Sequence, residues 1–108
     1  MARKFLESNG YKIIDSNVYT PYGELDIIAS RDEEIVFVEV KTRTTITFGF
    51  PEDAITNQKI QHIIESAQAF LQENPDFDQQ WRIDVIAIEG SPENKSSPKI
   101  NWYQNAVQ

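Results

Sequence analysis

Apolar side chains occur in two short β-branched runs, Ile27-Ile28-Ala29 and Ile35-Val36-Phe37-Val38, which are separated by the charged segment from Ser30 to Glu34. Such runs on either side of a short polar connection are typical of a β-hairpin. We expect a loop that is symmetric about the bond between Asp32 and Glu33. The cross-strand pairs in that register are Ile28 with Phe37, Asp26 with Glu39, and Glu24 with Lys41.

Alternation along the two strands supports this register. Side chains two residues apart share a face, so one face is wholly apolar and the other ends in charged residues. A slip of one residue would place Glu39 and Lys41 among the apolar side chains, so the register is well specified. We expect the longest helix to pack on the apolar face. The apolar face holds Leu25, Ile27, Ala29, Val36, Val38 and Val40, and the other holds Glu24, Asp26, Ile28, Phe37, Glu39 and Lys41.

The remaining segments are predicted from their period and their end signals. Apolar residues recur at helical spacing from Ile60 to Leu71, which indicates a long amphipathic helix with Thr56 as its N-cap and Asn74-Pro75 at its end. The other expected elements are a helix over Ala2–Ser8 stopped by Asn9-Gly10, a strand over Tyr11–Tyr19 bent at Asp15-Ser16-Asn17, a strand over Trp81–Ile88, and a short edge strand over Lys99–Tyr103.

The order of these elements predicts an α/β fold with a mixed sheet flanked by helices. The hairpin is antiparallel, and a helical crossover after its second strand permits a parallel neighbour. At 108 residues the chain is long enough for one domain, spanning 1–108, but not for two. The first helix begins abruptly, so we expect the chain to start inside that helix.

Composition narrows the function classes. The chain has no cysteine, which excludes disulfides, thiolate metal sites and cysteine nucleophiles and fits a cytoplasmic protein. No apolar run approaches the roughly 20 residues of a membrane span, so no membrane partner is expected. The formal net charge is −7, whereas nucleic-acid binders usually carry a basic surface. We therefore expect weak affinity for duplex DNA from this chain alone.

The paired acids of the hairpin are the first candidate for chemistry. Asp26 and Glu39 would face each other on one sheet face, where like charges are destabilising unless a cation or a proton lies between them. Hard carboxylate oxygens suit Mg²⁺ or Mn²⁺. The alternative is an exposed face whose acids are neutralised by Lys41 and Arg43. The sequence Glu-x-Lys closes an otherwise apolar strand opposite Glu-x-Asp, which favours the metal site.

Further side chains are candidates beside this pair. Lys59, near the start of the long helix, is either a phosphate contact or a solvated surface lysine. Arg43 is a candidate for contact with a nucleic-acid backbone. Asp84 either orients the site from a neighbouring strand or pairs with an arginine. His62 is expected on the polar face of the helix, and Tyr22 either stacks on bases or, as we favour, packs in the core.

A family signature is carried by Gly23-Glu24-Leu25-Asp26-Ile27-Ile28-Ala29, Val36-Phe37-Val38-Glu39-Val40-Lys41-Thr42-Arg43, Asn9-Gly10-Tyr11, Thr56-Asn57-Gln58-Lys59 and Arg82-Ile83-Asp84-Val85. These segments resemble the YraN family, a bacterial group of small domains that are similar to Holliday-junction resolvases within the PD-(D/E)xK nuclease superfamily. The resemblance covers nearly the whole chain. The full two-strand block is specific, whereas a bare D…ExK pattern is weak. The implied fold is a restriction-endonuclease-like mixed sheet.

The resemblance also implies a role for each position of the block. Asp26 and Glu39 would bind Mg²⁺ or Mn²⁺, with the backbone carbonyl of Val40 as a third ligand and Glu24 as a supporting or second-metal acid. Lys41 would orient or deprotonate the attacking water and stabilise charge on the phosphate. The implied reaction is hydrolysis of DNA phosphodiesters that leaves a 5′-phosphate. Resolvase-like domains usually carry a further glutamate in the first helix, and this chain starts too late to show it.

Three functional hypotheses follow. The first is a Mg²⁺-dependent endonuclease that acts on DNA, including branched DNA, as a homodimer. The second is a non-catalytic nucleic-acid-binding module that retains the nuclease fold. The third is an acidic domain that binds only protein partners.

Overall fold

The computed structural model describes residues 2–43, 57–75, 80–89 and 99–106 of the chain. The predicted elements are present there, with bounds that differ from the predicted ones by a residue or so. The predicted N-cap, Thr56, lies outside the described residues. In chain order the elements are α1 (Ala2–Ser8), β1 (Lys12–Thr20), β2 (Gly23–Arg31), β3 (Glu34–Arg43), α2 (Asn57–Glu73), β4 (Gln80–Glu89) and β5 (Lys99–Tyr103).

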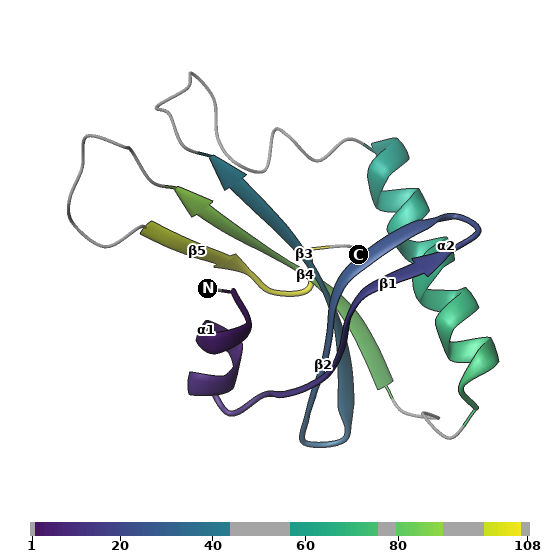
Figure 1. The fold of residues 1–108 in the computed structure, drawn as a ribbon, viewed down its shortest axis with the longest axis horizontal. Coiled ribbons are helices and arrows are strands. Elements are labelled where there is room, and N and C mark those ends of the chain that lie inside the picture. Colours follow the sequence, from purple (N-terminus) through teal and green to yellow (C-terminus); the bar gives the residue numbers. More distant parts are fainter. Residues whose placement is uncertain (1, 44–56, 76–79, 90–98, 107–108) are drawn as a thin grey trace.

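The strands form one mixed sheet in the order β1-β2-β3-β4-β5 (Figure 1). Three neighbouring pairs are antiparallel, and β3 runs parallel to β4. A parallel neighbour requires a crossover connection, and α2 lies in that connection. This arrangement confirms the predicted α/β class and is consistent with a restriction-endonuclease-like fold. Among the described residues, no helix is both long and apolar enough to cross a membrane.

The hairpin of β2 and β3 has the predicted register. Ile28 pairs with Phe37, and the ladder closes at the pair Arg31 and Glu34. The two loop residues between them, Asp32 and Glu33, have φ angles of 52° and 65°. Two successive positive φ angles give a two-residue turn whose twist matches that of the strands. Alternation and loop length therefore specify the same pairing.

The ladder between β2 and β3 is shorter than predicted. It extends from the turn to Ile27 and Val38 and does not include Asp26 with Glu39 or Glu24 with Lys41 as backbone partners. Beyond Ile27, β2 remains paired with β1 as far as Gly23. The register of β1 shifts between Ile13 and Asp15, and Asn17 has a φ of 52°. Such irregularities increase strand twist, so the outer hairpin turns away from β3.

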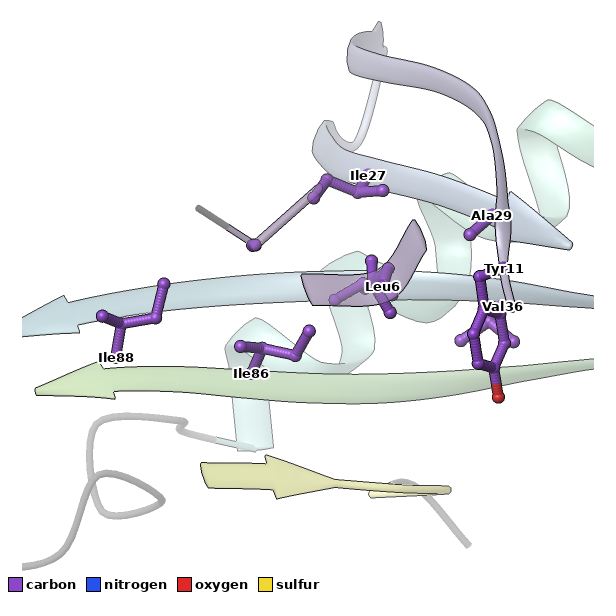
Figure 2. Close-up of a cluster of buried hydrophobic side chains, with 9 residues drawn as sticks. Leu6, Tyr11, Ile27, Ala29, Val36, Ile86 and Ile88 are labelled. Atoms are coloured by element: carbon purple, nitrogen blue, oxygen red, sulfur yellow. The ribbon is translucent and has the colours of Figure 1, made fainter. Parts of the chain in front are cut away.

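One face of the sheet is covered by α1 (Figure 1). Leu6 has no exposed surface and lies over the strands in Figure 2. Aromatic side chains close this layer, since the rings of Phe5 and Tyr11 contact Trp102 of β5 edge to face. The buried residues of this core are Ala2, Leu6, Tyr11, Ile27, Ala29, Val36, Val38, Ile86 and Ile88.

The long helix packs on the opposite face, so the prediction that it covers the face of Ile27 and Ala29 is wrong. Its Phe70 ring contacts Phe37 of β3 at a centroid distance of 5.9 Å. This face is charged only at its end, and its centre is apolar enough to bury a helix. The buried residues of this second core are Leu25, Ile28, Ile35, Phe37, Ile63, Ala67, Phe70 and Ile83. The start of α2 consequently lies on the same face as the candidate acids.

Candidate active site

A pocket of about 260 Å³ lies between the outer part of β2, the end of β3 and the start of α2. It forms where β2 parts from β3 and α2 covers the gap. Both candidate acids contribute to its wall. The lining residues are Tyr22, Gly23, Glu24, Asp26, Glu39, Lys59, His62, Ile63 and Ser66.

Asp26 lies at the point where the two strands separate. Its Oδ2 accepts a hydrogen bond of 2.9 Å from the backbone N–H of Val40. After the last ladder pair, Ile27 and Val38, the N–H of Val40 is the next one on β3 that points toward β2. The carboxylate of Asp26 therefore takes the place of a backbone acceptor on β2. In an extended strand the N–H and C=O of one residue point toward the same neighbour. The carbonyl of Val40 is therefore directed to the side on which Asp26 lies.

Glu39 is only 6% exposed and is paired with two ammonium groups. Its Oε1 is 3.4 Å from the Nζ of Lys41, on the same strand, and 3.1 Å from the Nζ of Lys59, on α2. A buried carboxylate needs such partners, because removing its charge from water is costly. Two lysines distant in sequence thus converge on one acid.

The environment of Asp26 changes its acidity. Burial raises the pKa of Asp26 above its ordinary value, and the charge and hydrogen-bonding contact of Glu39 raise it further. The N–H of Val40 and the charge of Lys59 act in the opposite direction without cancelling the rise. In the absence of a cation, Asp26 therefore retains its proton to higher pH than an isolated aspartate does.

Comparison with known proteins supplies the family. The sequence model described as "Uncharacterised protein family UPF0102" matches residues 1–88. The chain belongs to UPF0102. This is the YraN family, which is a nuclease-like member of the PD-(D/E)xK superfamily, so the resemblance inferred from the two strand blocks is confirmed.

Several relatives match this chain over most of their own length. A UPF0102 protein of Sulfurihydrogenibium sp. (strain YO3AOP1) is 47% identical over 90 residues, which cover 83% of this chain and 78% of the relative. One from Syntrophomonas wolfei is 43% identical over 88 residues, covering 82% and 76% respectively. One from Vibrio parahaemolyticus is 39% identical over 108 residues, covering 99% and 85%.

The structure brings together most of the site residues predicted for this UPF0102 chain. Asp26, Glu39, Lys41 and Lys59 form one connected group through the contacts described above. Glu24 lines the pocket but is exposed, and its Oε1 accepts a 2.7 Å hydrogen bond from the side-chain amide of Asn17 rather than contacting Asp26.

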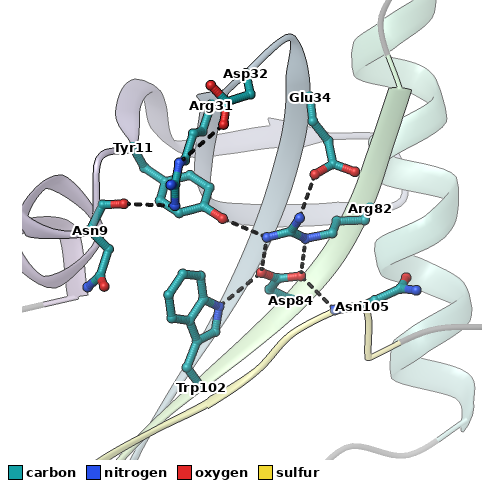
Figure 3. Close-up of polar contacts among 9 residues, drawn as sticks. All are labelled: Asn9, Tyr11, Arg31, Asp32, Glu34, Arg82, Asp84, Trp102 and Asn105. Atoms are coloured by element: carbon teal, nitrogen blue, oxygen red, sulfur yellow. Dashed lines mark hydrogen bonds and ion pairs between the residues drawn. The ribbon is translucent and has the colours of Figure 1, made fainter.

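Two further residues predicted from the sequence are Arg43 and Asp84. The backbone of Arg43 ends β3, and its side chain lies outside the described part of the structure. Asp84 is fully buried on the α1 face, where it binds Arg82, Trp102 and the backbone N–H of Asn105 (Figure 3). Of the two roles considered for Asp84, the structure assigns the pairing with an arginine, and Asp84 does not orient the pocket.

The donor set fits a small hard cation only in part. Across the described ranges, no group of three or more His, Cys, Asp or Glu side chains is arranged to hold a metal ion. Mg²⁺ is nevertheless commonly bound by one or two carboxylates together with water. Asp26 and Glu39 provide that number, and the carbonyl of Val40 is directed toward the same side. The pair fits a divalent ion that keeps several of its waters.

Several further residues line the pocket beside those predicted to form the site. Tyr22 is 50% exposed and lines the pocket, so the favoured prediction of core packing is wrong. Ser66 is buried at 1% exposure and lies at the pocket wall. A serine at a buried position of the apolar helix stripe was the available signal. His62 is exposed on α2, as expected, but it also lines the pocket.

Proposed function

We propose that this UPF0102 chain is a metal-dependent endonuclease-like protein that hydrolyses DNA phosphodiesters, including those of branched DNA, and that acts as a homodimer. One observation carries the proposal. Two carboxyl groups, Asp26 and Glu39, share a pocket that Lys59 also lines, and the ammonium groups of Lys41 and Lys59 both lie within 3.4 Å of Glu39. Acids and ammonium groups in one partly dry site are suited to stabilise charge that develops on a phosphate.

Asp26, Glu39 and the carbonyl of Val40 would hold Mg²⁺ or Mn²⁺. Such an ion would supply Lewis acidity toward water and phosphate oxygen. The raised pKa of Asp26 has a direct consequence, because Asp26 must lose its proton before both carboxylates can bind a cation. We therefore expect ion binding to release protons and to tighten as the pH rises.

The chain's own residues would position the reactants. Lys41 would donate a hydrogen bond to the attacking water or to a non-bridging phosphate oxygen, as a compact movable cation can. Lys59, whose ammonium group has three N–H donors, would donate one of them to a phosphate oxygen while it remains beside Glu39. Water forms the new bond to phosphorus and gives up one proton to the surrounding water, while the bond from phosphorus to the 3′ oxygen breaks. The 3′ oxygen then takes up a proton, and the other product carries the 5′-phosphate.

A non-catalytic nucleic-acid-binding module is the second candidate. Two ion pairs that already neutralise Glu39 favour this candidate. It is also favoured because, among the described residues, no third acidic side chain joins Asp26 and Glu39 in a group that could hold a metal ion. A site compensated in this way is stable without a cation. This candidate predicts binding that is indifferent to Mn²⁺ and to the Lys41→Ala change.

Cleavage of labelled branched, duplex and single-stranded DNA, with and without Mn²⁺ or Mg²⁺, tests the proposal. We expect metal-dependent nicking that Lys41→Ala and Asp26→Asn abolish. The control is Lys12→Ala, which removes an exposed lysine of β1 and should cut like the parent. Lack of nicking by the parent with either ion, or nicking that persists in Lys41→Ala, would refute the catalytic proposal.

Thermal melting gives a readout that needs no cleavage. A ligand at about a hundredfold excess over its Kd stabilises the folded state by about 2.7 kcal/mol. For a domain of this size, that is a rise in Tm of roughly 10 °C or more. Mn²⁺ should produce such a rise in the parent and in Lys12→Ala but not in Asp26→Asn. If Mn²⁺ leaves the Tm of the parent unchanged, the proposed metal site is contradicted.

A further inference from the structure

The turn between β1 and β2 presents an aromatic ring at the border of two pockets. Tyr22 is 50% exposed and lines the acid pocket. It also lines a second pocket of about 310 Å³ together with Glu65, Gln68, Ala69 and Gln72 of α2. Tyr19, on the same hairpin, is 77% exposed but lines neither of these pockets. Tyr22 thus connects the candidate chemistry with a neighbouring cavity.

The turn that carries Tyr22 is firmly held. The hydroxyl of Thr20 lies 2.9 Å from both the carbonyl oxygen of Gly23 and the hydroxyl of Ser66 on α2, and it accepts the backbone N–H of Tyr22 at 3.1 Å. Gly23 has a φ of 146°, which other residues adopt only with strain. Tyr22 is therefore fixed relative to α2 before any ligand binds, which lowers the entropic cost of binding.

The second pocket has the chemistry of a base site rather than a phosphate site. None of the five described residues that line it is lysine or arginine, and Glu65 would repel a phosphate. The amides of Gln68 and Gln72, one helical turn apart, can both donate to and accept from the edge of a base. The ring of Tyr22 offers a stacking surface that any base can use.

We propose that the second pocket binds an unpaired nucleobase, stacked on Tyr22, whose neighbouring phosphate lies at Asp26 and Glu39. The proposal rests on the proposed function and narrows its substrate class to strands with unpaired bases beside the scissile phosphate. A base stacked inside a duplex cannot offer its face to Tyr22. Stacking would let a chain with a net charge of −7 bind a nucleic-acid strand with few contacts to phosphates.

Binding in EDTA tests the base site without any cleavage. The probes are fluorescent oligothymidylate and the same strand paired with oligoadenylate, followed by anisotropy at low salt. The parent should bind the single strand more tightly than the duplex. Tyr22→Ala should weaken single-strand binding roughly 5- to 150-fold, the usual range for loss of one base stack. Tyr22→Phe keeps the ring and should restore binding, and Tyr19→Ala is the matched control that should bind like the parent.

The outcomes separate this inference from the proposed function. Equal binding of single strand and duplex, parent-like binding by Tyr22→Ala, or an equal loss in Tyr19→Ala would overturn the base site, whatever the cleavage assay shows. Lack of metal-dependent nicking together with a selective loss in Tyr22→Ala would refute catalysis and leave the base site standing. Parallel melting curves for the parent, Tyr22→Ala and Tyr22→Phe would show that the comparison is made on folded chains.

Discussion

The carboxylate of Asp26 accepts the N–H of Val40 at 2.9 Å and shares a pocket with Glu39. One oxygen thus completes the edge of a strand, while the acid as a whole belongs to the candidate site. The two roles have opposite electrostatic requirements. The hydrogen bond favours the charged form, whereas burial and the charge of Glu39 oppose it more strongly and leave the pKa of Asp26 raised.

The raised pKa of Asp26 predicts how stability depends on pH. The folded chain binds this proton more tightly than the unfolded chain, whose aspartate has an ordinary pKa of 3.8. The resulting stabilisation is complete below that value and is lost as the pH rises through the raised pKa. Asp26→Asn keeps an acceptor for the N–H of Val40 and does not titrate. The free energy of unfolding of this variant, relative to that of the parent, should therefore increase as the pH rises through the pKa of Asp26.

Urea denaturation of the parent and of Asp26→Asn, in metal-free buffer from acidic to neutral pH, measures this difference. The variant should be the more stable protein at neutral pH. Glu33→Gln, an exposed change in the β2–β3 turn, is the control and should show no comparable difference. Free energies of unfolding for the parent and Asp26→Asn that run parallel with pH would contradict the assignment.

At the scale of elements, buried polar contacts join segments that are far apart in the chain. Asp84 on β4 accepts hydrogen bonds from the guanidinium of Arg82 at 2.9 Å, the indole of Trp102 at 2.9 Å and the backbone N–H of Asn105 at 2.8 Å. Arg82 in turn donates to Tyr11 and pairs with Glu34 (Figure 3). This group joins β3, β4, β5 and the start of β1 on the face that α1 covers.

Asp84→Asn should destabilise the fold strongly without touching the pocket. Asp84 has no exposed surface, and removing one partner of a buried ion pair typically costs about 3–5 kcal/mol. Asp32→Asn removes a surface partner of Arg31 and should cost less than about 1 kcal/mol. Urea denaturation at neutral pH measures both changes. A cost for Asp84→Asn below about 1 kcal/mol would show that the group does not hold the strands together.

The contact between Thr20 and Ser66 joins the tip of the β1–β2 hairpin to α2 across 46 residues of sequence. Thr20→Val removes the acceptor of the Tyr22 N–H as well as the link to the helix, and should cost about 2 kcal/mol. Amide hydrogen exchange at Tyr22 should become faster in this variant. Thr20→Ser keeps the hydroxyl and should behave like the parent, and unchanged exchange in Thr20→Val would show that the turn is held by other contacts.

Local patterns predicted the elements and the register of the central hairpin, because alternation and a two-residue loop act over short distances. They did not predict where the ladder ends, which depends on the bend of β1 around Asn17. The face that α2 covers was misassigned because Ile28 and Phe37 make the other face apolar as well. The exposure of Tyr22 depends on Thr20 and Ser66, whose contact no local pattern specifies.

At the scale of the whole molecule, the net charge of −7 contrasts with the two ammonium groups gathered at one acid. Long-range attraction of a polyanion by such a chain is weak, so the proposed affinity for DNA would have to come from contacts within the site. In the proposed function, Lys41 and Lys59 are the described cations that would contact a phosphate. The field of the whole molecule and the local site would therefore act in opposite directions on a nucleic-acid strand.

This balance predicts a shallow dependence of binding on salt. Each phosphate neutralised on a single strand contributes about −0.7 to the slope of log K against log salt, so two lysines give a slope of roughly −1.4. Anisotropy titrations of oligothymidylate over a range of salt concentrations in EDTA measure this slope. Lys59→Ala should make it less negative. A slope steeper than roughly −4 would require a basic surface beyond these two lysines.

The parting of β2 from β3 has an evolutionary consequence. Since Asp26 occupies the place of an absent strand partner for Val40, a relative without the proposed catalysis would still be stabilised by an acceptor at this position. Retention of Asp26 in a relative would then be explained by its contribution to the fold as well as by a role in catalysis. Lys41 contacts Glu39 of the acid pair and, among the described contacts, binds no backbone group. Loss of Lys41 would therefore identify such a lineage.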